Sequence, residues 1–254
     1  MPRSQSVSTN RIPSRSNRHL SVRQHHWLTI IIMVLCLNVI WWQQPIFYEH
    51  FLAQAQHWDV WPLVGYSFSA SVAIALMIRS NFTHRASYLF LVLSMLVIAN
   101  SQIRTRFEIL LLLLLFICFL FMIPQKIFQI KNALGLLIFS VLATYAIPVS
   151  IYFLANNFIT QLFLHQSWIM LFAFLYFFTP LFLPNARGRL LSLATILFFW
   201  VTVLVIHGVN FSSFLAIFIS LPPFLLQFSK RYFKRWEPMC ALICLMLAIC
   251  LLYQ

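Results

Sequence analysis

Two arginines and a glutamate form the group of residues best suited to chemistry. Arg104 and Arg106 stand just before a long apolar run, and Glu108 follows them closely. A guanidinium group binds phosphate or carboxylate through two parallel hydrogen bonds. A helix that begins beside them adds a partial positive charge and free amide donors. These residues predict an anion-binding site, and the alternative is a structural pair between Arg104 and Glu108 one helical turn apart.

Two histidines complete the candidate anion-binding set. The topology derived below places His165 and His207 on the same outer side as Arg104 and Arg106. A polar surface assembled from several loops on one side is what an active or binding site needs. The alternative is that short outer loops simply have to be polar. No residue is assigned a catalytic role, because the sequence lacks a G-x-S-x-G motif, a P-loop and paired catalytic carboxylates.

Metal binding is a weaker hypothesis. The segment Glu49–Asp59 contains two histidines and two acids, but their spacing matches no signature such as a helical H-E-x-x-H. Cys240 and Cys244 stand four residues apart in an apolar segment, which is more typical of core packing. We therefore predict neither a metal site nor a cofactor.

One short stretch resembles a known family. The segment Asn100–Glu108, which opens into Leu110–Leu115, resembles part of the O-antigen ligases and polymerases, and His207–Asn210 resembles a His/Asn loop there. The resemblance implies an outward arginine that meets a lipid-linked pyrophosphate. The large outer loop of that family is missing here.

The elements that must position these residues are transmembrane helices. Hydrophobic residues make up 62% of the 254 residues and charged residues 8%, whereas soluble domains carry about 25% charged residues. No charged residue occurs from Leu190 to Ser229. That run would form a helix of roughly 60 Å, about twice the hydrocarbon thickness, so it must hold two spans. Because such runs are apolar on every face, we expect an all-α polytopic protein rather than alternating strands.

We expect a bundle of about nine transmembrane helices, with eight or ten as alternatives, in a single domain over residues 27–254. Residues 1–26 are polar and contain no acid, which predicts a disordered basic cytoplasmic tail. The predicted spans are Trp27–Phe47, Val60–Ile78, Ala86–Asn100, Phe107–Ile123, Ala133–Leu154, Ser167–Leu183, Leu190–Ile206, Phe211–Phe228 and Pro238–Tyr253.

The basic residues predict the orientation. With nine spans and the N-terminus inside, all of the 17 lysines and arginines except Arg104 and Arg106 fall on the inner side. This asymmetry predicts an N-terminus in, C-terminus out topology, in what we take to be a bacterial inner (plasma) membrane. It also accounts for the net charge of +13 without a nucleic-acid partner. Tryptophans predicted at or near the outer interface agree with this topology; they are Trp41, Trp42, Trp58, Trp61 and Trp168.

Three classes of function follow from these features. All four acids are predicted to lie outside the bilayer core, and the chain has only four glycines; both features disfavour ion-coupled and rocking transporters. The first hypothesis is a scaffold, accessory or assembly component, whose partners are the lipid bilayer and other membrane proteins. The second is an outer-face enzyme that acts on a lipid-linked or phosphorylated substrate, like a glycan ligase or polymerase. The third is a transporter that is not ion-coupled.

Overall fold

The described residues form a series of helices. The computed structural model describes residues 15–47, 57–80, 82, 85–125, 130–228 and 237–254, and for residues 15–26, 57–59 and 102 it describes the backbone alone. No strand occurs in this part of the chain. The predicted all-α class is therefore confirmed for the described residues.

Each predicted apolar segment contains one helix. The first helix begins at Arg15, inside the segment that was predicted to be a tail, and a single turn, α5, was not predicted. The helices are α1 (Arg15–Phe47), α3 (His57–Arg79), α4 (Ala86–Ile98), α5 (Ser101–Arg104), α6 (Phe107–Met122), α7 (Ala133–Asn156), α8 (Gln161–Phe182), α9 (Ala186–His207), α10 (Phe211–Leu226) and α11 (Glu237–Leu252).

Five of these helices are long and apolar enough to cross a membrane. They are residues Trp27–Phe47 of α1, residues Val60–Arg79 of α3, and α7, α8 and α9. The other apolar helices, α4, α6, α10 and α11, have 13 to 16 residues. At 1.5 Å per residue they reach only about 20 to 24 Å, which is less than the roughly 30 Å of a hydrocarbon core.

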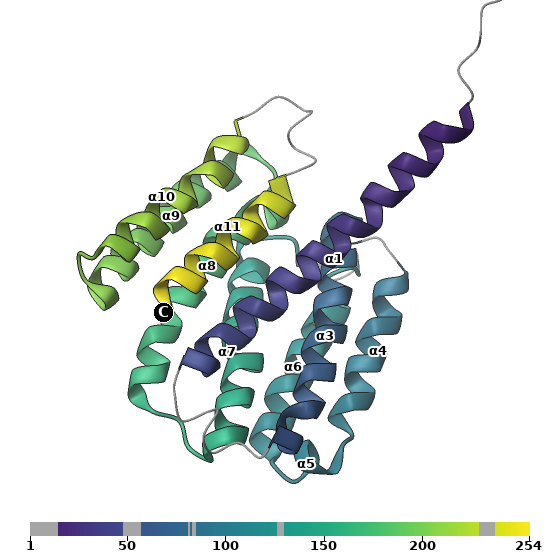
Figure 1. Cartoon of the computed structure of the whole chain (residues 1–254), viewed down its shortest axis with the longest axis vertical. Helices are drawn as coiled ribbons and strands as arrows, with labels where there is room; N and C mark the ends of the chain where they lie inside the picture. Colours follow the sequence, from purple (N-terminus) through teal and green to yellow (C-terminus); the bar gives the residue numbers. More distant parts are fainter. Residues whose placement is uncertain (1–14, 48–56, 81, 83–84, 126–129, 229–236) are drawn as a thin grey trace, which may run out of the picture.

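The helices form two groups that cross each other. Figure 1 shows α3, α4, α6 and α7 standing side by side, while α1, α10 and α11 run diagonally across the view. Helix α1 packs against α3, α7 and α11, so it joins the two groups. We call the end formed by α5 and the α7–α8 link the Arg104 end, and the opposite end the Arg189 end.

Aromatic rings fill the interior of the bundle. The ring of Phe139 in α7 lies 4.8 Å from that of Phe178 and 5.6 Å from that of Phe182, both in α8, between ring centroids. It also meets Phe116 of α6 at 6.4 Å. Trp41 of α1 packs edge-on against Phe116 at 6.2 Å. Because interiors pack to crystal-like density, rings in these positions leave little free space where α1, α6, α7 and α8 meet.

The prediction that Trp41 belongs to an interfacial aromatic belt is wrong. Its side chain is fully buried, and its indole N–H donates to the carbonyl oxygen of Ala143 in α7 at 3.0 Å. A buried tryptophan needs such an acceptor for its polar edge. By contrast, Trp27, Trp61 and Trp168 are exposed.

Serine side chains link α3 to its neighbours. The hydroxyl of Ser67 accepts from the indole of Trp42 at 3.1 Å, and that of Ser71 accepts from the amide of Asn38 at 2.8 Å, so both bind α1. Ser69 bonds Ser94 of α4 at 2.6 Å. Small polar residues of this kind let membrane helices approach closely and bond across the interface.

A tight turn joins α9 to α10, between the two segments that were predicted as the spans Leu190–Ile206 and Phe211–Phe228. Helix α9 ends at His207, Gly208 has a φ of +73°, and α10 begins at Phe211. The side-chain amide of Asn210 donates to the carbonyl of His207 at 2.9 Å. Pairing of Gln227 with Ser192 and of Trp200 with Ser220 shows that the two helices run antiparallel.

Candidate functional site

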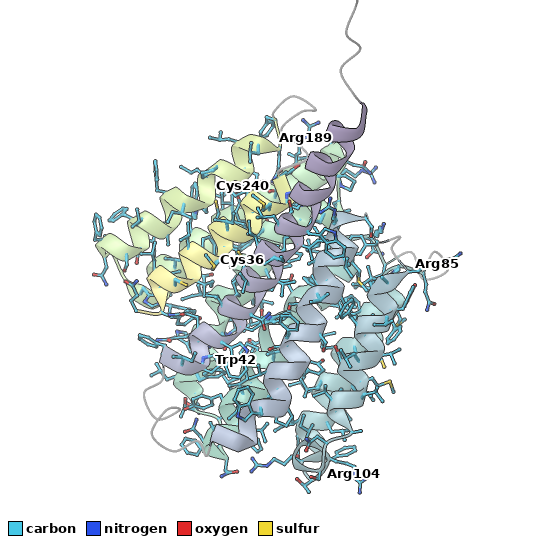
Figure 2. The ribbon with its side chains drawn as sticks, turned by 45° about the vertical axis from the view of Figure 1, so that its right-hand side comes forward. Cys36, Trp42, Arg85, Arg104, Arg189 and Cys240 are labelled. Carbon is cyan, nitrogen blue, oxygen red and sulfur yellow. The ribbon has the colours of Figure 1, made fainter. Side chains whose placement is uncertain are left out.

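Arg104 is held at one end of the bundle by a compact link. After α4 ends, the amides of Ile103 and Arg104 both donate to the carbonyl of Asn100, at 3.2 and 3.0 Å. These bonds form the single turn α5 directly after the end of α4. The side chain of Arg104 is exposed, and Figure 2 shows it at the opposite end of the bundle from Arg189. The link therefore fixes the backbone of Arg104 while its guanidinium group stays accessible.

Arg106 makes a different, structural contact. It is half-buried and has an extended backbone just before α6. Its guanidinium group donates to the carbonyl of Phe153 at 3.3 Å and lies 5.6 Å from the centre of the Phe153 ring. Phe153 is in the last turn of α7, where a positive charge is favoured by the helix dipole. Arg106 thus ties the start of α6 to the end of α7.

The alternative pairing of Arg104 with Glu108 is not formed. Helix α5 ends at Arg104, and the extended residue Arg106 separates it from α6. An (i, i+4) pair requires one continuous helix between its members. Glu108 is exposed in the first turn of α6, and no ion pair joins it to Arg104 in the described part of the chain.

The two candidate histidines lie on other helices than the arginines, His165 on α8 and His207 at the end of α9. His165 is exposed near the start of α8. His207 is half-buried and meets the ring of Tyr253 edge-on at 6.3 Å, and its buried Nε2 has no hydrogen-bond partner among the described residues. Figure 1 places the α9–α10 turn far from α5. The structure therefore does not gather Arg104, Arg106 and His207 into one site.

A buried polar network near the Arg104 end was missed by the sequence analysis. The amide of Gln44 is fully buried and donates to Ser167 at 2.8 Å, while its Oε1 has no partner among the described residues. Gln43 donates to the carbonyl of Tyr253 at 3.1 Å, and the Tyr253 hydroxyl donates to the carbonyl of Gln166 at 2.8 Å. The network joins α1, α8 and α11. The signal was the Gln43–Gln44 pair inside an apolar span, where a polar side chain needs a partner.

Metal ligands do not gather in the described part of the chain. No group of three or more histidine, cysteine or acidic side chains lies together there. The side chains of the segment Glu49–Asp59, considered above for a metal, lie outside the described residues. The sulfur atoms of Cys240 and Cys244 are 4.0 Å apart on one face of α11.

An open groove lies beside the α4–α5 link. It has a volume of about 630 Å³ and runs between the first turns of α3 and the last turn of α4. Its lining residues are Trp61, Pro62, Gly65, Leu96, Val97, Ala99 and Asn100.

Comparison with known proteins adds no relative: no family model, curated protein or solved structure matches the chain. The likeness to O-antigen ligases and polymerases stated above rests on those short segments alone.

Proposed function

We propose that this chain is a multi-pass membrane protein that acts as a scaffold or assembly component rather than as a carrier of solutes. The observation that supports this most is the packed interior, in which Phe139 meets rings from α6 and α8. A carrier needs a binding site near the middle of the bilayer, lined by broken helices or ionisable groups. Away from the ends of the bundle, the described helices meet through aromatic rings and uncharged polar side chains.

In this proposal all the helices except the single turn α5 cross a bacterial inner membrane, with the N-terminus inside. Two facts support the topology. Consecutive helices run in opposite directions (Figure 1). Arg104 and Arg189, which the nine-span topology assigns to different sides, lie at opposite ends of the bundle (Figure 2). The four shorter helices would need local thinning of the bilayer or burial among their neighbours.

An outer-face enzyme is the second candidate, and the accessible guanidinium group of Arg104 is the observation that favours it. Such an enzyme would need further groups close to Arg104. The guanidinium group of Arg106 is bound to the carbonyl of Phe153. The α9–α10 turn, which follows His207, lies far from α5 (Figure 1). The scaffold therefore remains the better-supported proposal, and we find no observation that favours the transporter.

The two candidates can be separated in the organism that produces the chain. Deletion of the gene should lower the abundance of at least one other membrane protein, as measured by quantitative mass spectrometry of membranes. Re-expression of the chain should restore it. A variant with Arg104, Arg106, His165 and His207 all changed to Gln should restore it as well, because a scaffold needs none of them for chemistry.

Two results would count against the scaffold. One is a membrane proteome that does not change on deletion. The other is failure of the fourfold variant to restore the lost protein although the variant is inserted at the wild-type level. Arg85→Gln controls for the loss of a positive charge elsewhere on the protein.

A further inference from the structure

Two thiols lie side by side on α11. Cys240 and Cys244 stand one helical turn apart, and their sulfur atoms are 4.0 Å apart, so that one thiol can donate a hydrogen bond to the other. Both are free cysteines. Because side chains four residues apart are neighbours on a helix surface, the backbone of α11 by itself holds the two sulfur atoms together.

The distance between these sulfur atoms suits a pair that binds one metal ion. A metal–sulfur bond is about 2.3 Å long, so two sulfur atoms bound to the same ion lie at most about 4.6 Å apart. The observed 4.0 Å falls within this limit. Both sulfur atoms can therefore reach one ion without a change in the helix.

The position of the pair on α11 favours binding of a cation. Cys240 is half-buried and lies in the first turn of α11, and Cys244 is buried one turn further along. The partial positive charge at a helix N-terminus stabilises the thiolate, which is the form that binds metals. Figure 2 shows Cys240 in the half of the bundle nearer to Arg189, which the proposed topology assigns to the cytoplasmic side. Thiols stay reduced on that side.

The kind and number of ligands select the ion. Thiolates are soft ligands, which favour Cu(I), zinc and iron–sulfur clusters. Structural zinc and iron–sulfur clusters usually take four side chains as ligands. In the part of the chain that the structure describes, no three histidine, cysteine or acidic side chains lie together. Cu(I) is the soft ion that two thiolates can hold.

We propose that Cys240 and Cys244 together bind one Cu(I) ion. Each thiol loses its proton to solvent as its sulfur atom bonds to copper, so two S–H bonds break, two Cu–S bonds form, and copper stays in its +1 state. The sequence favoured core packing for this pair, because the spacing alone does not give the distance between the sulfur atoms. The site goes beyond the scaffold role and does not depend on it.

The test uses the full-length protein in detergent, kept anaerobic and reduced without added thiols, and titrated with Cu(I) in competition with a chromogenic copper chelator. The wild type should take one copper ion per chain from the chelator. Cys240→Ser and Cys244→Ser should each weaken binding at least roughly tenfold, because loss of even an outer partner of a metal ligand costs this much. Cys250→Ser, a change at another half-buried cysteine of α11, is the matched control and should bind copper like the wild type.

Two further measurements on the wild type do not depend on these variants. Bound Cu(I) should protect Cys240 from a membrane-permeant alkylating reagent, as measured by mass spectrometry of peptides, while the exposed Cys118 of α6 reacts as before. X-ray absorption of the copper-loaded protein should show sulfur neighbours at roughly 2.3 Å from the copper. If a serine variant does not fold, these two measurements decide the matter.

Three outcomes would overturn the proposal. Equal copper binding by Cys240→Ser and the wild type would mean that the pair only packs the core. A loss of binding in Cys250→Ser as large as that in Cys244→Ser would mean that copper binds the thiols without preference for the pair. Nitrogen or oxygen neighbours alone around the copper would place the ion on other side chains.

Discussion

At the scale of single residues, tertiary partners decide what each side chain does. Trp41 and Trp61 both looked interfacial in the sequence, yet Trp41 is buried and Trp61 is exposed. Polar residues stand on several sides of α1 near Trp41 (Asn38, Gln43 and Gln44), so periodicity could not indicate which face meets α7. Arg104 and Arg106 likewise form one motif in the sequence. Arg106 donates to the carbonyl of Phe153, 47 residues further along the chain, whereas the side chain of Arg104 is exposed. No local sequence pattern predicts the contact between Arg106 and Phe153.

Because only Arg106 binds another helix, substitutions of Arg104 and Arg106 should affect the stability of the fold differently. Arg106→Gln should lower the free energy of unfolding by about 1 kcal/mol, because the half-buried bond to the Phe153 carbonyl is lost. Arg104→Gln should leave it unchanged within about 0.5 kcal/mol, as expected for an exposed side chain. Thermal unfolding of the purified protein in detergent gives both values. Equal losses in the two variants would show that Arg106 is not the structural member of the pair.

At the scale of elements, composition predicted the helices well and their ends less well. Every apolar segment between charged or polar stretches became a helix, because a long apolar run in lipid must satisfy its backbone internally. Helix α8 begins at Gln161 rather than Ser167, since the Thr160 hydroxyl accepts from the amide of Phe163 at 3.2 Å and caps it earlier. The single turn α5 was missed because its four residues carry no periodic signal.

The α9–α10 turn offers a test at this scale. Gly208 has φ +73° and ψ −172°, a region of backbone space that other residues rarely adopt. Gly208→Ala should therefore lower the free energy of unfolding by roughly 1 to 3 kcal/mol. Gly65→Ala is the matched control, because its Cβ would make only an ordinary van der Waals contact. Unchanged unfolding of Gly208→Ala would contradict this account of the turn.

At the scale of the whole molecule, the described helices pack into one bundle with Arg104 and Arg189 at opposite ends. The all-helical architecture followed from composition, whereas the crossing of α1 over α3 and α7 depends on which side chains fit together. Only part of the candidate site could be predicted. Arg104 stood out as a basic residue predicted to lie on the outer side, but the groove between α3 and α4 depends on how these helices pack around Gly65.

The most direct test of this account is the accessibility of single cysteines in intact cells. In a chain whose five native cysteines are replaced by alanine, one cysteine is introduced at Val209 or at Asn157, and in a separate variant at Asn185. A membrane-impermeant thiol reagent should label the first two from outside, because they lie in links assigned to the outer face. It should label Asn185→Cys only after the cells are permeabilised. Labelling of Asn185→Cys in intact cells, with protection of Val209→Cys, would contradict the proposed topology.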